Sequence, residues 1–264
     1  MEKQNDWGRD EGNAILVSMN TALFCLLLLV TCFPTPGHSE GTEPLIQRLK
    51  KTAAPGNGIS PAEQDIAKQL QIIGAPAIPY LLPLLQYPDE EVRSLASYTL
   101  RDIDGLTEEH LDVLIESSRR GDGWIPLAIA RIGTEKAVTF LVAQLVYQRR
   151  ETQTTWAVVH LGKKAVPQLV DVYETAKDWD DQLSQSLVFV FKHLGIKAPA
   201  AVAPLQKTAA NEAISREIRL GAVAALGPIG LTAEKSIPEL QKLRKSGDED
   251  IADAAASAII NIGS

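Results

Sequence analysis

Two stretches in the middle of the chain share one design: "WAVVHLGKKAVPQLV" from Trp156 to Val170, and "VFVFKHLGIKAPAAVAPL" from Val188 to Leu205. Each contains His-Leu-Gly, then a short basic or apolar link, then an apolar run marked by alanine and proline. The two histidines, His160 and His193, are either a matched pair of catalytic or metal-binding groups or two copies of one structural part. The rest of the sequence decides between these interpretations.

The shared design belongs to a period that runs through the chain. Aliphatic residues that close a helix, usually followed by glycine, recur at intervals of 29 to 35 residues, at Ile73, Ile103, Ile132, Leu161, Leu194, Ile229 and Ile262. The residues three and seven positions before each closing residue fall on one stripe of a helix, and most of them are apolar. Glycine just past the last turn predicts a left-handed C-cap. Each period is therefore expected to end in a buried helix with a glycine stop.

The first half of each period is predicted to be helical as well. Ser60, Pro61 and Glu63 have the spacing of a capping box with proline at the first helical position. Asp89 is suited to be the N-cap of the second helix of its repeat. Pro83 lies inside the first helix of the same repeat and is expected to bend or shorten that helix. Tandem helix pairs of this size cannot bury their apolar faces alone, so they stack. We expect an all-α fold, a right-handed α-solenoid of about seven antiparallel helix pairs.

The repeats resemble the HEAT-repeat family, specifically the short bacterial type named after phycobilisome lyases. The resemblance covers Glu43 to Ser264 and is carried by "GAPAIPYLLPLLQYPDEEVRSLASYTLRDI", "GKKAVPQLV" and "REIRLGAVAALGPIG". The third and fourth repeats depart from it, because Leu111 and Val138 stand near the position of the proline in the first helix. We expect residues 40–264 to form one HEAT-repeat solenoid domain.

The N-terminal 39 residues have the features of an export segment. Both cysteines, Cys25 and Cys32, lie in or beside an apolar run from Ala22 to Phe33 whose length suits a signal peptide. Small residues just before Glu40 make cleavage there plausible. We expect residues 1–39 to be a signal peptide or N-terminal membrane anchor, and the protein to be exported.

The acidic start of this segment is unusual for a signal peptide and leaves alternatives open. One alternative is that translation starts at Met19 rather than Met1. A second is that the segment from Ala14 to Phe33 stays in place as an uncleaved anchor. A third alternative is lipidation at Cys32, because "LVTC" resembles a bacterial lipobox. The expected location is the periplasm or the exterior, with a membrane tether through this segment or through lipidated Cys32.

Composition and motifs argue against several classes of function. The 264 residues carry a net charge of -7, which disfavours a nucleic-acid binder. The sequence contains no P-loop, GxSxG elbow, CxxC or HExxH motif. The HEAT-like family includes di-iron hydroxylases whose ligands are His-Glu dipeptides, and this sequence has no His-Glu pair. We therefore predict no catalytic residue, no metal site and no cofactor.

The two histidines occupy the same position in their repeats, one residue before the closing leucine. The other repeats place very different residues there, namely Ile72, Asp102, Arg131, Pro228 and Asn261. A position that accepts such a range is a partly exposed helix end, where a histidine cation also suits the helix dipole. Equivalent residues of adjacent repeats lie about 10 Å apart, too far for two nitrogens to bind one zinc ion. His160 and His193 are therefore predicted to be two copies of one structural part.

The residues five positions before each closing residue point away from the buried stripe. Four consecutive repeats place large apolar residues there, and basic residues follow them, which together gives Tyr98, Arg101, Leu127, Arg131, Trp156, His160, Phe189 and Lys192. In HEAT solenoids the second helix of each pair lines the concave face, so an exposed aromatic stripe predicts a protein- or peptide-binding groove. The alternative is that these rings fill the seams between repeats. Trp124 and Trp179 begin helices and are expected to be packing elements.

These observations favour a non-enzymatic interaction scaffold that binds a protein or peptide along the concave face, with an acidic partner favoured by the cations. The alternative function is an enzyme or enzyme accessory of the lyase-like branch. Its site would lie in the same groove and would use Arg101, Arg131, His160 and Lys192. No nucleic-acid partner is expected.

Overall fold

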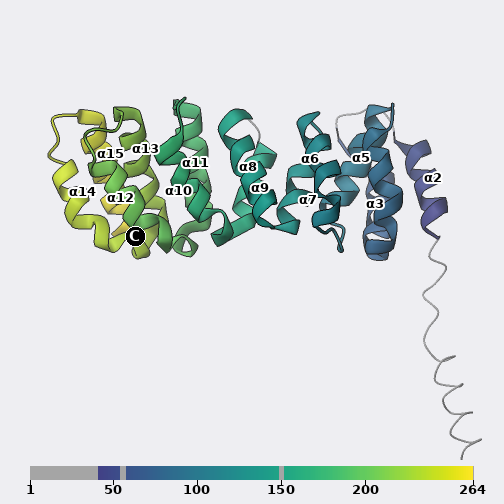
Figure 1. Cartoon of the computed structure of the whole chain (residues 1–264). Coiled ribbons are helices and arrows are strands. Elements are labelled where there is room, and N and C mark those ends of the chain that lie inside the picture. The colour runs from purple at the N-terminus through teal and green to yellow at the C-terminus, as the bar shows by residue number, and fades with distance from the viewer. Residues whose placement is uncertain (1–40, 54–57, 149–151, 264) are drawn as a thin grey trace, which may run out of the picture. The chain divides into compact units, whose positions relative to one another are not determined.

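The computed structural model describes residues 41–53, 58–148 and 152–263, and the regular elements within these ranges are all helical (Figure 1). The predicted export segment, residues 1–39, lies outside them. The first helices of successive pairs are α2 (Thr42–Thr52), α4 (Ile78–Leu81) continued by the 3₁₀ helix η2 (Leu82–Gln86), α6 (Leu111–Arg119), α8 (Glu135–Gln148), α10 (Val166–Thr175), α12 (Val202–Ala210) and α14 (Ile237–Leu243). The second helices are α3 (Pro61–Ile73), α5 (Glu90–Arg101), α7 (Ile125–Ile132), α9 (Thr152–Leu161), α11 (Asp181–Leu194), α13 (Arg216–Leu226) and α15 (Glu249–Gly263). The predicted all-α solenoid and its seven helix pairs are confirmed for the described part of the chain.

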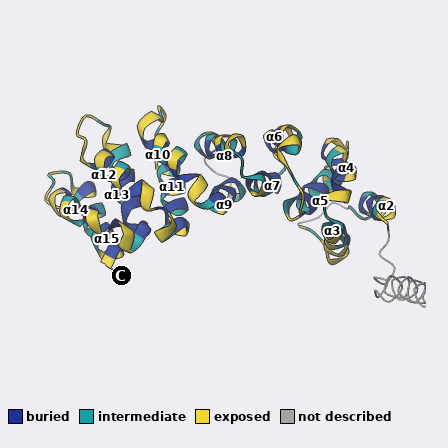
Figure 2. Cartoon of the chain, turned by 60° about the horizontal axis from the view of Figure 1, so that its bottom comes forward, coloured by how far each residue is buried: buried dark blue, intermediate teal, exposed yellow. Residues whose placement is uncertain are grey.

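The pairs stack so that first helices form one layer and second helices form another. Each second helix packs against the next one, from α3 through α5, α7, α9, α11 and α13 to α15. In the other layer, contacts join α2 to α4, α8 to α10, α10 to α12, and α12 to α14. Figure 2 shows buried residues on the helix faces that meet neighbouring helices and exposed residues on the opposite faces. The outward faces of the second helices are therefore available to a partner.

The core follows the stripe predicted from the sequence. Three positions before the closing residue, Leu70, Leu100, Ile129, Val158, Phe191 and Leu226 are each 0% exposed. Ile259 at the equivalent position of the last repeat is only half-buried. Seven positions before the closing residue, Thr154 is a buried polar exception, and its hydroxyl has no hydrogen-bond partner among the described residues. A buried hydroxyl without a partner costs about 1–3 kcal/mol, so Thr154 is a weak point of α9.

The predicted helix starts are confirmed by their hydrogen bonds. At α3, the Glu63 N–H donates to Ser60 Oγ at 3.3 Å, and the Ser60 N–H donates to Glu63 Oε2 at 2.6 Å, which completes the capping box. At α5, a carboxylate oxygen of Asp89 accepts from the N–H groups of Glu91 and Val92 at 2.9 and 3.3 Å. These caps satisfy N–H groups that the helix itself leaves without partners.

Proline determines how the first helices begin and where they break. The first helix of the second repeat changes from α to 3₁₀ geometry after Leu81, and Pro83 lies within the 3₁₀ part, as predicted. Where Val138 stands near the proline position, α8 runs without interruption for 14 residues. Where Leu111 stands there, a single 3₁₀ turn precedes α6. Without the proline, α8 is longer than the proline-led α10 (Val166–Thr175), whereas α6, with 9 residues, is not. The helix pairing is intact in both repeats.

Five of the six glycine stops adopt positive φ as predicted, whereas Gly263 does not and lies within α15. The ψ values of the five differ. Gly133 is left-handed, with φ 59° and ψ 25°, and its N–H donates to the Ile129 carbonyl. Gly74 and Gly195 have φ 71° and 49° but extended ψ values of -138° and -132°. Gly230 likewise has φ 72° and an extended ψ of -150°. The left-handed prediction is thus wrong at these three positions. The physical reason is that a 3₁₀ helix of the next repeat follows at once, so the chain must turn away without completing a left-handed cap.

Trp179 is a packing element, as predicted, and it joins the fifth repeat to the sixth. Its ring centroid is 4.9 Å from that of Tyr173, which is 1% exposed on α10. It also lies against Gly221 of α13, where an added Cβ would stand 2.6 Å from Trp179 Cζ2. Burial raises the pKa of Tyr173, so this phenol stays neutral within the core.

Within the described ranges, no helix taken singly has the length and apolar character needed to cross a membrane. Two consecutive segments, Asp181–Lys197 and Pro199–Ala210, reach that threshold only together, and they are bent by 119° to each other. Leu187 and Phe191 of the first segment are fully buried in the solenoid core.

Candidate protein-binding surface

The residues predicted to bind a partner lie on four consecutive second helices. They are Tyr98 and Arg101 on α5, Leu127 and Arg131 on α7, Trp156 and His160 on α9, and Phe189 and Lys192 on α11. None of these side chains is buried, although Tyr98 and Leu127 are half-buried and pack against the core. The aromatic rings nevertheless contact one another across the seams between repeats. They are therefore partly exposed on the surface and partly packed in the seams, so each of the two alternatives predicted from the sequence is partly present.

Three aromatic side chains from α9 and α11 form the Trp156 cluster, which consists of Trp156, Phe189 and His193. The Trp156 ring meets Phe189 edge to face, with centroids 5.2 Å apart, and meets His193 at 4.7 Å. His193 lies 4.1 Å from Phe189, and its Nδ1 is 2.9 Å from the Phe189 carbonyl oxygen. Trp156 remains 43% exposed, although aromatic rings are costly to leave in water. The cluster is thus a preformed apolar contact point on the surface.

A second group, the Arg101 cluster, joins α5 to α7 and consists of Arg101, Tyr98 and Trp124. The Tyr98 and Trp124 rings meet edge to face at 5.5 Å. The Arg101 guanidinium lies 4.5 Å from the Tyr98 centroid and 4.8 Å from the Trp124 centroid, within the range of cation–π attraction. Its Nε also donates to Asp102 at 2.7 Å. The guanidinium covers both rings, so this cluster is less open than the Trp156 cluster.

The cations of α5 and α7 are engaged by nearby acids. Arg101 pairs with Asp102, and Arg131 pairs with Asp104 at 2.5 Å. Burial opposes the charge of Arg101, but the hydrogen bond to Asp102 and its negative charge outweigh burial and raise the pKa of Arg101. Leu127 lies on α7 and packs half-buried against the core. This part of the surface is therefore close to neutral.

The cations of α9 and α11 have a different environment. Lys163 follows α9 in the 3₁₀ helix η4 (Gly162–Lys164), Lys192 lies in the last turn of α11, and Lys197 ends the 3₁₀ helix η5 (Gly195–Lys197). All three are exposed, and none forms an ion pair within the described part of the chain. We call Lys163, Lys192 and Lys197 the lysine edge.

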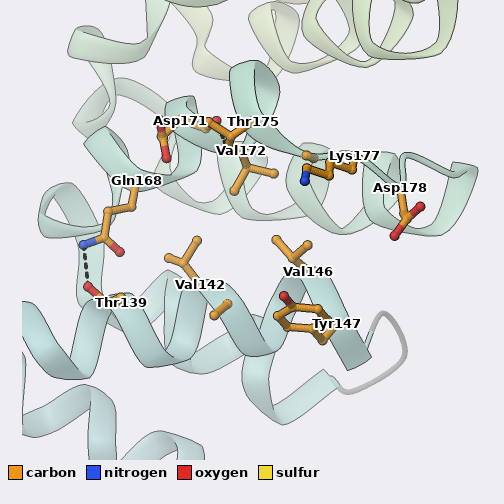
Figure 3. A pocket seen from close by; sticks show the side chains of 12 residues that line it. Thr139, Val142, Val146, Tyr147, Gln168, Asp171, Val172, Thr175, Lys177 and Asp178 are labelled. Carbon is orange, nitrogen blue, oxygen red and sulfur yellow. Dashed lines mark hydrogen bonds between the residues drawn. The ribbon is translucent and has the colours of Figure 1, made fainter.

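A separate hollow lies on the first-helix layer, between α8 and α10 (Figure 3). Val142, Val146 and Val172 supply its apolar wall, and its volume is about 630 Å³. A hydrogen bond of 3.0 Å from Gln168 to Thr139 bridges the two helices. Tyr147 lines the hollow and is 83% exposed, which makes it a useful control for Trp156.

The two histidines differ in their surroundings. His193 stacks in the Trp156 cluster, whereas His160 is exposed at the end of α9. The described residues contain no group of three or more histidine, cysteine, aspartate or glutamate side chains that could hold a metal ion. His160 and His193 thus share a position near the end of a second helix but not the same contacts.

Sequence reasoning missed three contributors to this surface: Trp124, Lys163 and Lys197. Trp124 was assigned to packing only, and its contact with Tyr98 depends on how α5 and α7 meet. The two lysines carried a readable signal, because successive repeats have lysine within two residues of the glycine stop, as Gly-Lys-Lys and Gly-Ile-Lys.

No protein-family model and no curated protein matches the chain. Among solved structures it is similar to a designed armadillo repeat protein at 20% identity, with 83% of this chain and 99% of that chain covered and a TM-score of 0.35. A second designed armadillo repeat protein, in complex with the peptide (KR)4, is 19% identical, with 84% and 100% covered and a TM-score of 0.35. An engineered protein is 19% identical, with 87% and 93% covered and a TM-score of 0.34. The solenoid fold itself follows from the stacked helix pairs described above.

Proposed function

We propose that this protein is a non-enzymatic scaffold that binds a protein or peptide segment along the outward faces of α5, α7, α9 and α11. The observation that carries the proposal is the Trp156 cluster, an aromatic contact point with a 43% exposed tryptophan at its centre. Exposed aromatic residues that are held in place by neighbours are the usual anchors of protein interfaces. We also propose, on the sequence motifs, that the repeats are HEAT repeats of the type named after phycobilisome lyases.

The spacing of the repeats predicts the spacing of apolar side chains along an extended partner segment. Equivalent positions on neighbouring second helices lie about 10 Å apart, and an extended chain rises about 3.3 Å per residue. An extended segment that crosses the helices therefore meets one repeat about every three residues. Leu127, Trp156 and Phe189 would receive apolar side chains with that spacing.

The enzymatic alternative used Arg101, Arg131, His160 and Lys192 as a polar site. Two of these residues are held by acids: Arg101 pairs with the adjacent Asp102, and Arg131 pairs with Asp104, which follows α5 in the preceding repeat. Arg101 is also stacked on two rings. The observations therefore favour binding through the aromatic residues over chemistry through the polar ones.

The test is selection of peptides from a random 12-residue display library on the predicted solenoid domain, residues 40–264. Selected peptides are synthesised, and their affinities are measured for the wild-type protein, for Trp156→Ala and for Tyr147→Ala. We expect Trp156→Ala to weaken binding by about 2 kcal/mol, which is roughly 30-fold, because it removes the anchor.

Tyr147→Ala is the matched control, because it removes an aromatic ring that is more exposed than Trp156 but lies on the other layer. Its affinity should equal that of the wild type. Selected peptides that bind equally well to Trp156→Ala, or that depend on Tyr147 instead, would contradict the proposed surface.

A further inference from the structure

We infer that the segment recognised by this surface is acidic, with carboxylates that lie on the lysine edge while an apolar side chain contacts the Trp156 cluster. This inference rests on the proposed binding function and adds the chemical class of the partner. The region around α9 and α11 differs in charge from the whole chain, whose net charge is -7. Residues 152–170 and 182–211 contain no aspartate or glutamate, and they include α9, all of α11 after its first residue, Asp181, and both turns that carry the lysine edge.

The state of pairing separates this region from the rest of the surface. Arg101 and Arg131 have their charges balanced by Asp102 and Asp104. Lys163, Lys192 and Lys197 have no such acid within the described residues. The strongest positive potential on the second-helix layer is therefore expected beside Trp156, at the end of α9 and α11.

Cations near helix C-termini can have a purely structural role, because they offset the negative end of the helix dipole. That end is equivalent to about half an elementary charge and contributes about 0.3–1 kcal/mol at the surface. The second helices α3, α13 and α15 end without any basic residue in the last turn. The fold thus does not need cations at these ends, and the lysine edge exceeds what two dipoles require.

The geometry specifies how the acidic residues are placed relative to the anchor. Side chains one helical turn apart lie about 6 Å from each other, and Trp156 and the end of α9 are separated by one to two turns. A partner that crosses the helices at Trp156 and then turns toward the end of α9 covers that distance in two to three extended residues. The expected motif therefore has carboxylates two to three residues from an apolar side chain, on the side that faces the lysine edge.

The experiment uses three fluorescent peptides of one length, Glu-Glu-Pro-Leu-Pro-Glu-Glu and its counterparts with lysine or glutamine in place of glutamate. Binding is measured by anisotropy to the wild type, Lys192→Glu, Lys163→Glu, Lys192→Arg and Lys207→Glu. Lys207 is an exposed lysine on α12, in the first-helix layer. Lys207→Glu therefore makes the same change in net charge as Lys192→Glu but outside the proposed binding surface. We expect the glutamate peptide to bind best, each reversal at Lys192 or Lys163 to weaken it about tenfold, and Lys192→Arg and Lys207→Glu to retain affinity.

Two further measurements exclude other roles for the lysines. Thermal melts of Lys192→Glu and Lys207→Glu should coincide, whereas a role in helix stability would lower only the first. Raising the salt from about 0.1 M to about 1 M shortens the screening length from about 10 to about 3 Å, so the preference for the glutamate peptide over the glutamine peptide should vanish.

Equal binding of the three peptides, or a loss as large in Lys207→Glu as in Lys192→Glu, would overturn the inference. So would lysine-dependent binding to vesicles of phosphatidylserine and phosphatidylcholine in the absence of any preference among the peptides, because the surface would then recognise lipid. If peptide affinity depends on Trp156 but not on Lys192, the proposed function stands and only the inference of an acidic partner is wrong. Independence from both residues removes both.

Discussion

At the scale of the residue, Trp156 occupies an environment between core and free surface. Its edge-to-face contact with Phe189 and its contact with His193 bury part of the ring, and 43% remains exposed. Such a side chain contributes to stability in proportion to the part that is buried. The same residue can therefore hold a repeat seam together and offer an anchor to a partner.

The first prediction concerns the stability of Trp156→Ala. We expect a loss of about 1–2 kcal/mol in the free energy of unfolding, less than the roughly 3–5 kcal/mol for truncating a fully buried aromatic residue. Urea denaturation measures it, and Tyr147→Ala should change stability by no more than about 0.5 kcal/mol. A loss of the larger size would show that Trp156 belongs to the core, and the surface would lose its anchor.

A second prediction separates backbone strain from steric crowding at two glycines. Gly105 and Gly121 have nearly equal φ values of 98° and 96°, but an added Cβ at Gly105 would stand 2.6 Å from the Cβ of Ala75, whereas Gly121 has open space. We expect Gly121→Ala to cost about 1–2 kcal/mol from the backbone alone. Gly105→Ala should cost about 1–3 kcal/mol more, because Ala75 must move. Equal urea midpoints for the two variants would contradict this division.

At the scale of the element, the second helices were more predictable than the first. The closing aliphatic residues, the buried stripe and the positive φ of five of the six glycine stops all depend on local periodicity, so they can be predicted from the sequence. The first-layer hollow between α8 and α10 depends on how far apart two helices of different repeats settle, which no local pattern encodes. The pairing of Arg101 with Asp102 was readable from adjacency, but its stacking on Trp124 required the tertiary structure.

The third prediction concerns an ion cluster that ties α13 to the last helix pair. Arg216 Nε and Nη2 donate to Asp248 at 2.6 and 3.1 Å, and Nη2 also contacts Asp250. The hydrogen bond from Arg216, followed by that from the Ile251 N–H, lowers the pKa of Asp248 below its ordinary value. A lowered folded-state pKa means that the stabilisation is present above the unfolded value of about 3.9 and is lost as the pH falls through the folded value.

Acid should therefore loosen the last repeat below about pH 4, and hydrogen exchange of α15 amides measures the effect. In Arg216→Ala this acid-dependent increase in exchange should be smaller, because the cause of the lowered pKa is gone. Lys242→Ala is the control, since Lys242 pairs with Glu239 inside α14. An identical pH dependence in wild type and Arg216→Ala would contradict the role of the cluster.

At the scale of the whole molecule, the proposed export segment gives a prediction about the mature chain. Residues 1–39 combine an apolar run with small residues before Glu40, so we expect the natively expressed protein to begin at Glu40. Intact-mass spectrometry measures this directly. A diacylglyceryl adduct on Cys32 would support the lipoprotein alternative, and an unprocessed N-terminus recovered from the cytoplasm would contradict export.

The stacked helix pairs give the molecule two separate outward faces, with aromatic anchors on the second-helix layer and the valine-lined hollow on the first. A partner that uses the proposed surface must leave the hollow unchanged. This separation makes the location of binding measurable within one sample.

The most direct measurement is an NMR titration of the isotope-labelled protein with the acid-flanked leucine peptide. The indole N–H of Trp156 reports on the proposed surface, and Val142, Val146 and Tyr147 report on the hollow. We predict saturable shifts of the Trp156 indole and of Phe189 and His193 resonances, with the hollow unchanged. Shifts confined to the hollow, or an unchanged Trp156 indole at saturating peptide, would contradict the assignment of the second-helix face as the binding surface.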